Sequence, residues 1–193
     1  MSEDGGKALL VVDLQNDFCP GGSLAVAEAD NIIPVVNDLL GFFDKKGWHI
    51  FMSRDWHPGK HCSFKEFGGS WPPHCIRGTR GARFPEDLHL PERVELISKA
   101  VEEEKDAYSA FQDTGLAEIL KERGVSSLFV CGLATDVCVK HTVLDALEEG
   151  FSVHLIRDAV KGVNLQPDDS RMAIEEMEKA GASLTNSDTV FSL

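Results

Sequence analysis

Cys138 is a candidate nucleophile because of its position after a predicted turn. Cys138 ends the stretch Cys131-Gly132-Leu133-Ala134-Thr135-Asp136-Val137-Cys138, in which Gly132 permits a sharp turn and Thr135 or Asp136 can cap a helix. This spacing predicts that Cys138 lies in the first turn of a helix, where free N–H groups and the helix dipole stabilise a thiolate or a developing oxyanion. The same position also suits a buried cysteine that packs as a small apolar residue.

Two charged side chains would complete the needs of a cysteine amidase. Asp13 ends the apolar run Ala8–Val12, and Lys105 follows the acidic run Glu102–Glu104. The carboxylate could carry the thiol proton and the cation could hold the anions in place. Each residue also has an ordinary interpretation, Asp13 as a turn residue and Lys105 as a solvated charge.

A second reactive group lies in the long segment 54–91, which is rich in Gly, Pro, His and Trp. Loops of this length in a compact domain are usually functional or disordered. One carboxylate and three imidazoles are the candidate metal ligands: Asp55, His57, His61 and His74. This donor set suits one divalent ion, with Zn²⁺ expected first and Fe²⁺ or Mn²⁺ as alternatives. The alternative interpretation is a set of surface histidines.

The elements that must position these residues alternate between strands and helices. The expected strands are Ala8–Val12, His49–Met52, Val94–Ile97, Leu128–Cys131, Val153–Ile156 and a last one within Ala182–Phe191. The expected helices are Ile32–Asp44, Leu116–Arg123, Val137–Glu149 and a segment from Pro167 to Lys179. This alternation predicts one α/β domain over 1–193, with a doubly wound, mainly parallel sheet and helices on both faces. Ligands of such sheets bind beyond the carboxyl ends of the strands, where the candidate residues converge.

Composition narrows the classes of partner. A formal net charge of −13 and a pI near 4.9 argue against nucleic acid as the ligand. No apolar run approaches the roughly 20 residues of a membrane span, and the N-terminus does not have the pattern of a signal peptide. The five cysteines are scattered without a CxxC pair, which favours a reduced, cytoplasmic protein. No GxGxxG motif opens the first helix, so a dinucleotide-binding protein is disfavoured.

These residues, in this order, resemble the nicotinamidase/pyrazinamidase family of the isochorismatase-like cysteine hydrolases over nearly the whole chain. The matching segments are Val12-Asp13-Leu14-Gln15-Asn16-Asp17-Phe18-Cys19 with Gly21-Gly22-Ser23-Leu24, Asp55-Trp56-His57-Pro58 with His61, Trp71-Pro72-Pro73-His74-Cys75 with Gly78-Thr79, Lys105 leading to Tyr108-Ser109-Ala110-Phe111, and Gly132 to Cys138. The resemblance implies an isochorismatase-like, Rossmann-like three-layer fold.

The resemblance further implies hydrolysis of nicotinamide, and of pyrazinamide, through a cysteine thioester. In that reaction Asp13 would move the protons, Lys105 would hold Asp13 and the Cys138 thiolate in register, and the N–H groups of Ala134 and Cys138 would bind the oxyanion beside a cis Leu133–Ala134 peptide. A metal on Asp55, His57, His61 and His74 would bind the ring nitrogen of the substrate. Four residues would contact the substrate, the first two on either face of its ring: Phe18, Trp71, Tyr108 and Leu133. A small carboxamide is thus the expected partner, and a homo-oligomer is compatible with this scheme.

Two rival functions fit parts of the pattern. Another amidase of the same superfamily, acting on carbamoyl or ureido groups, would need Cys138 but not the Asp/His loop. A non-catalytic binding module would use the loop as a structural zinc site and Cys138 as packing. Loss of ammonia release in Cys138→Ala, with fold and metal retained, would separate the enzyme from the module.

Overall fold

Six parallel strands form the sheet on which the rest of the chain is built. The computed structural model describes residues 6–193, and the strands follow the order β3-β2-β1-β4-β5-β6. Their bounds are β1 Lys7–Val12, β2 His49–Asp55, β3 Glu95–Lys99, β4 Ser127–Leu133, β5 Ser152–Lys161 and β6 Ser183–Thr185. The strand order reverses between β1 and β4, which creates the crevice at which doubly wound sheets bind ligands.

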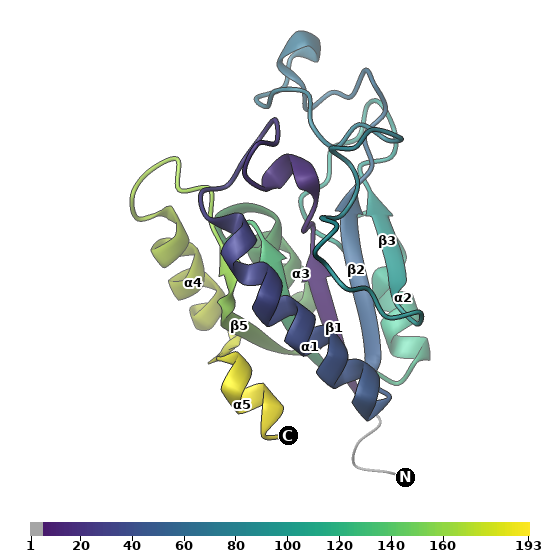
Figure 1. The fold of residues 1–193 in the computed structure, drawn as a ribbon, viewed down its shortest axis with the longest axis vertical. Coiled ribbons are helices and arrows are strands. Elements are labelled where there is room, and N and C mark those ends of the chain that lie inside the picture. Colours follow the sequence, from purple (N-terminus) through teal and green to yellow (C-terminus); the bar gives the residue numbers. More distant parts are fainter. Residues whose placement is uncertain (1–5) are drawn as a thin grey trace.

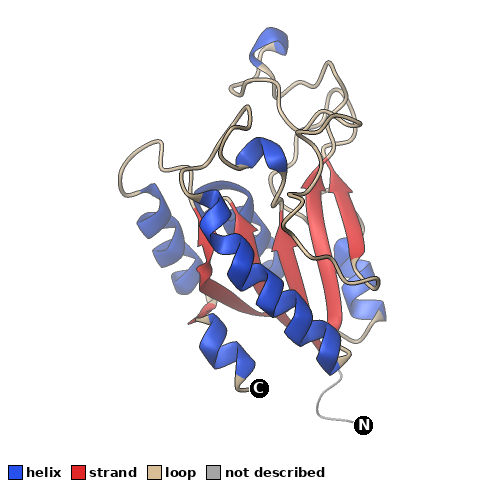
Figure 2. Cartoon of the chain, in the orientation of Figure 1, coloured by secondary structure: helices blue, strands red, loops and turns tan. Residues whose placement is uncertain are grey.

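Helices cover both faces of the sheet, so the expected three-layer α/β fold is confirmed (Figures 1 and 2). The helices are α1 Ile33–Lys46, α2 Leu116–Glu122, α3 Lys140–Glu148, α4 Asp169–Ala180 and α5 Ser187–Phe191. Buried residues of α1 and α5 belong to one apolar cluster, whereas those of α2, α3 and α4 belong to another. Right-handed crossovers of parallel strands distribute helices to the two faces in this way.

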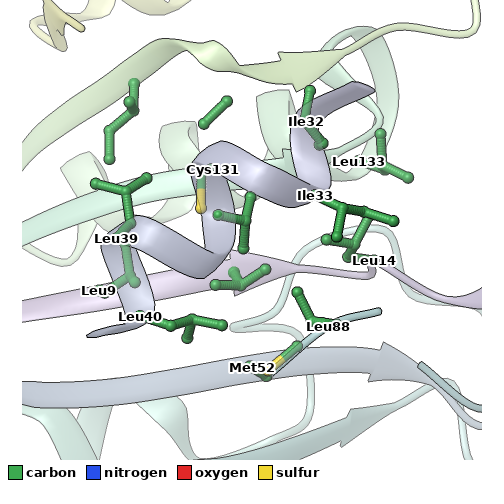
Figure 3. Close-up of a cluster of buried hydrophobic side chains, with 14 of the residues drawn as sticks. Leu9, Leu14, Ile32, Ile33, Leu39, Leu40, Met52, Leu88, Cys131 and Leu133 are labelled. Atoms are coloured by element: carbon green, nitrogen blue, oxygen red, sulfur yellow. The ribbon is translucent and has the colours of Figure 1, made fainter. Parts of the chain in front are cut away.

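The core on the α1 side shows why the apolar runs become strands and helices (Figure 3). Leu39 and Leu40 of α1 and Leu9 of β1 lie in this one cluster, and each of these side chains is fully buried. Cys131 of β4 lies in this cluster at 0% exposure, and burial raises the pKa of its thiol. Cys131 is therefore a packing residue, the ordinary role of a buried cysteine.

Most expected elements are present, with shifted ends. The last strand, Ser183–Thr185, lies within the expected region Ala182–Phe191, and the helix α5 follows it from Ser187 to Phe191. The helix expected from Val137 begins instead with one π-helical turn, Thr135–Val139, before α3 starts at Lys140. The strand expected to end at Ile97 continues to Lys99, and this extension changes the composition of the site.

The long segment between β2 and β3 is ordered by contacts rather than by regular elements. It contains a single 3₁₀ turn, Lys65–Phe67, and two isolated bridges, His57 with Ile76 and Phe64 with Trp71. In Figure 1 the first part of this segment lies above the carboxyl ends of the strands, and its last part runs back along the sheet to the start of β3. No helix within residues 6–193 is long and apolar enough to cross a membrane.

Candidate active site

Asp13 leaves β1 at the crevice with its carboxylate fixed by β2. Its backbone has a positive φ of 44°, and its N–H donates to Ser53 O at 3.2 Å. Ser53 Oγ in turn donates to Asp13 Oδ1 at 2.7 Å. The second oxygen, Oδ2, forms an ion pair with Lys99 Nζ at 3.0 Å rather than a directional hydrogen bond. This oxygen therefore keeps capacity to accept a proton.

Lys99, the last residue of β3, is the cation of the site. Its side chain is fully buried, and Nζ lies 2.6 Å from Asp55 Oδ1 as well as 3.0 Å from Asp13 Oδ2. Nζ also donates to Ala107 O at 3.0 Å and lies 3.6 Å from Cys138 Sγ. One ammonium thus contacts both carboxylates and the candidate nucleophile.

The expectation that Lys105 is this cation is wrong. The Lys105 side chain is 57% exposed and its Nζ pairs with Glu102 at 3.1 Å, so the ordinary interpretation of a solvated charge is the correct one. The sequence does contain a signal for Lys99. It stands two residues beyond buried Ile97, on the same face of β3, and a lysine buried on a sheet face requires anionic partners.

Cys138 lies in the π-helical turn that follows β4. Its side chain is buried at 6% exposure, and the preceding Leu133–Ala134 peptide is cis, as the resemblance implied. Gly132 makes this path possible because its φ is +109° and an added Cβ would lie 2.2 Å from Val12 O. Acidic oxygens of Asp13 and Asp55 and the Cys138 sulfur all lie within 4.8 Å of one another.

The charges of this cluster determine its resting protonation. Burial raises the pKa of the Cys138 thiol, and Asp13 and Asp55 add to that rise against the effect of Lys99. Burial also raises the pKa of Asp13, which Lys99 opposes. The two carboxylates and the sulfur outweigh the burial of Lys99, so its pKa is raised. Cys138 therefore rests as a thiol beside an ammonium, and attack requires a base.

Three of the four expected metal ligands converge next to this cluster. The Nε2 atoms of His57 and His74 each lie 3.9 Å from an Asp55 carboxylate oxygen. Each Nδ1 faces a backbone carbonyl, that of His74 at 2.9 Å for His57 and that of Pro72 at 2.8 Å for His74. Because a backbone carbonyl can only accept a hydrogen bond, each Nδ1 donates to it and Nε2, the nitrogen nearer Asp55, is left to bind a metal, which is the arrangement of metal-binding histidines.

Protonation also fits a metal at these residues. Burial lowers the pKa of His57 to about 4, so its imidazole is neutral near pH 7, as ligation requires. Burial opposes ionisation of Asp55, but Lys99, His57 and His74 together lower its pKa, so the carboxylate is anionic. One carboxylate and two imidazoles suit Zn²⁺ with positions left open for other ligands.

His61 is not placed in this group of ligands. Its ring stacks on that of His57 with centroids 4.2 Å apart, but both of its nitrogens have protein partners. Nδ1 lies 2.7 Å from Ser63 Oγ, and Nε2 lies 2.9 Å from Lys105 O. The structure thus differs from the expected set of four, because His61 ties the loop to the backbone of the segment after β3.

A cavity of about 470 Å³, counted with its open mouth, joins the two groups. All four residues expected to contact the substrate line it together with Asp55, His57, His74, Ala134 and Cys138: Phe18, Trp71, Tyr108 and Leu133. Trp71 Nε1 donates to Tyr108 Oη at 3.1 Å, which fixes two of these aromatic walls. Sequence reasoning did not find Leu24 and Val163, whose loops reach the cavity only through the tertiary fold.

The fold and the site define a three-layer α/β protein in which a buried cysteine, an acid and a lysine are arranged for cysteine-dependent hydrolysis. Residues 7–189 match the isochorismatase domain, and the chain belongs to this family. It is 42% identical to the nicotinamidase of Escherichia coli strain K12, over 92% of this chain and 93% of that protein. These matches confirm the resemblance inferred from the motifs.

Two solved structures have closely similar folds. The pyrazinamidase of Pyrococcus horikoshii, in complex with zinc, is 50% identical with a TM-score of 0.90, over 93% of this chain and 98% of that one. A protein from L. infantum, in complex with nicotinate, is 35% identical with a TM-score of 0.89, over 97% and 96% of the two chains.

Proposed function

We propose that this chain hydrolyses nicotinamide to nicotinate and ammonia, and that it also accepts pyrazinamide. The observation that carries the proposal is the single aromatic cavity in which Cys138, Asp55, His57 and His74 meet. The nicotinamidase of E. coli and the nicotinate complex of the L. infantum protein support the same substrate. A carbamoyl or ureido amidase would have no use for the Asp/His group at one end of the cavity.

The proposed chemistry uses Cys138 as nucleophile and Asp13 as the proton carrier. Asp13 takes the thiol proton, and the Cys138 sulfur forms a bond to the carboxamide carbon. Asp13 then returns the proton to the amide nitrogen as the C–N bond breaks, which releases ammonia and leaves a thioester. Water attacks the thioester with Asp13 as base, and the products are the carboxylate and the free thiol. The raised pKa of Asp13 brings its basicity closer to that required near neutral pH.

Two further sets of groups support this sequence. The N–H groups of Ala134 and Cys138 would stabilise the oxyanion, a type of donor worth about 10²–10³ in rate. Lys99 would keep Asp13 and the sulfur at reacting distance while anionic charge moves between them. Both roles follow from positions at the carboxyl ends of β3 and β4.

A divalent metal, which we propose to be zinc, would be held by Asp55, His57 and His74. When bound, it supplies a Lewis acid for the ring nitrogen of the substrate. The zinc complex of the P. horikoshii pyrazinamidase supports this choice of ion. Phe18 and Trp71 would pack on the flat ring, with Tyr108 and Leu133 at its edge.

The first experiment measures ammonia release from nicotinamide by the purified protein, its Cys138→Ala variant and a Cys62→Ala control. Cys62 is a free cysteine outside the cavity lining, so its replacement should leave turnover unchanged, whereas Cys138→Ala should abolish turnover with the fold and metal content intact. Turnover of N-carbamoyl amino acids in preference to nicotinamide would favour the rival amidase. Unfolding of Cys138→Ala, with wild-type protein inactive, would favour the binding module.

The cysteines and the sequence pattern also support a proposal for the cellular location of this enzyme. All five cysteines are free, which agrees with our proposal of a reduced, cytoplasmic protein. We further propose that residues 1–193 act as one domain, since every group of the site comes from a single sheet and its loops. Fractionation of the producing cells would test the location.

A further inference from the structure

The short segment after β1 contributes two further polar residues beside the proposed catalytic Asp13. Gln15 is fully buried. Its side chain forms hydrogen bonds with both the N–H and the C=O of Asp55, one of the proposed metal ligands. Its Oε1 accepts from Asp55 N at 2.8 Å, and its Nε2 donates to Asp55 O at 2.8 Å and to Ala82 O at 3.0 Å. One amide therefore fixes the backbone of Asp55 and ties it to the loop.

Asp17 acts on the second ligand-bearing segment. Its Oδ2 accepts from Cys75 N at 2.7 Å, and its Oδ1 accepts from Ser23 N at 3.3 Å. Cys75 directly follows His74 and has a φ of +47°, a conformation that non-glycine residues adopt only when their surroundings enforce it. The carboxylate of Asp17 supplies that constraint next to the imidazole that faces Asp55.

We propose that Gln15 and Asp17 are positioning residues of the metal site, which hold Asp55 and His74 at ligand distance and so set the affinity for zinc. This inference rests on the metal site of the proposed function. Its physical basis is that outer partners of metal ligands typically contribute about 10–100-fold in metal affinity. The same six-residue stretch, 13–18, would then connect the proton carrier, the metal site and the ring-binding Phe18.

The chain offers a matched control, a second side-chain amide that forms hydrogen bonds with the backbone of the loop. Asn37 of α1 also holds the loop through its amide, with Nδ2 donating to Asp87 O at 2.8 Å and Oδ1 accepting from His89 N at 2.8 Å. These contacts have the same chemistry as those of Gln15 but lie next to no candidate ligand. Replacement of Asn37 therefore shows how the loss of such hydrogen bonds to the loop affects zinc affinity and stability by itself.

The test measures the dissociation constant for Zn²⁺ by competition with a chromogenic chelator, and the thermal midpoint of each apoprotein, for wild type, Gln15→Ala, Asp17→Ala, Asn37→Ala and His74→Ala. We expect Gln15→Ala and Asp17→Ala to bind zinc about 10–100-fold more weakly, and Asn37→Ala to stay within twofold of wild type. Excess zinc should restore nicotinamide turnover in the first two variants, which a purely structural defect would not allow.

Two further variants keep the test decisive if the alanine variants do not fold. Gln15→Met keeps the side-chain length without the hydrogen bonds. Gly81→Ala leaves Asp17 in place but displaces its carboxylate, because a Cβ at Gly81 would overlap Asp17 Oδ2. A zinc affinity equal to that of Asn37→Ala in the Gln15 or Asp17 variants would overturn the positioning role. Wild-type affinity in His74→Ala would instead overturn the metal site itself, so the two failures are distinguishable.

Discussion

Lys99 neutralises two carboxylates that would otherwise repel each other within a buried site. Asp13 and Asp55 both lie within 3.0 Å of its Nζ, and all three side chains are almost fully buried. Removing one partner of such a network leaves an uncompensated charge in a poorly solvated place, which costs about 3–5 kcal/mol. The proposed proton carrier and the proposed metal ligand therefore depend on the same ammonium.

The first prediction compares the two lysines. Lys99→Met should lower kcat/KM for nicotinamide by at least about 10² and lower the thermal midpoint, because Asp13 and Asp55 lose their shared cation. Lys105→Met should leave both quantities near wild type, since Lys105 is exposed and pairs with Glu102 at the surface. Ammonia release and thermal unfolding of the two variants check this. A greater loss of activity in Lys105→Met would contradict the assignment.

The second prediction concerns the acid limb of the pH profile. The proposed reaction needs ionised Asp13, whose pKa is raised by burial and lowered by the hydrogen bond from Ser53. Ser53→Ala removes that hydrogen bond, which favours the protonated acid and raises the pKa further. The acid limb of kcat/KM should therefore move to higher pH in Ser53→Ala, with the rate at the plateau less affected. A limb that stays fixed, or moves to lower pH, would show that Asp13 is not the titrating group.

At the scale of single residues, the sequence predicts which residue types form the site better than it predicts the contacts that each of them makes. The sequence points to five residues because each follows a strand or stands in a dense histidine motif: Cys138, Asp13, Asp55, His57 and His74. Lys99 was missed because the end of β3 was placed at Ile97, and the register that pairs Asp55 with Lys99 is a property of the sheet. The partners of His61 likewise depend on a backbone carbonyl from a distant segment.

At the scale of elements, the approach of β4 to β1 decides the path into the nucleophile turn. Gly132 lies beside Val12, with a bulge in the pairing of β4 with β5 between Val130 and Gly132. Strand order and helix layers were predictable from periodicity, because each apolar run must be buried on the sheet. The π-helical turn and the β4 bulge were not, since local spacing is compatible with an ordinary helix start.

The third prediction compares two glycines in different elements. Gly132→Ala should destabilise the protein strongly, because its φ is +109° and the new Cβ would overlap Val12 O, and it should also reduce turnover by moving the turn that carries Cys138. Gly41 is an exposed residue of α1 with open space around an added Cβ. Gly41→Ala should therefore stabilise the protein by about 0.5–1 kcal/mol. Urea unfolding of both variants measures these changes. Equal stability of the two would contradict the close approach.

At the scale of the whole molecule, the metal site would connect the sheet to its longest loop. Asp55 ends β2, whereas His57 and His74 belong to the segment that leads to β3. A ligand that binds only the folded state stabilises it by RT ln(1 + [L]/Kd), which is about 4 kcal/mol at a thousandfold excess over Kd. Metal occupancy should therefore affect global stability and the integrity of this loop together.

The fourth prediction is that chelation lowers the thermal midpoint and exposes the segment between β2 and β3 to protease, because two of the three ligands lie in that segment. Cys138→Ala should respond to chelator as wild type does, since its metal ligands are intact although it has no nucleophile. His74→Ala should show a low midpoint that chelator does not lower further. Thermal unfolding and limited proteolysis, each with and without added Zn²⁺, measure these responses. A chelator-induced shift of wild-type size in His74→Ala would place the stabilising metal elsewhere in the chain, and the ring-binding role of Asp55, His57 and His74 would fall with it.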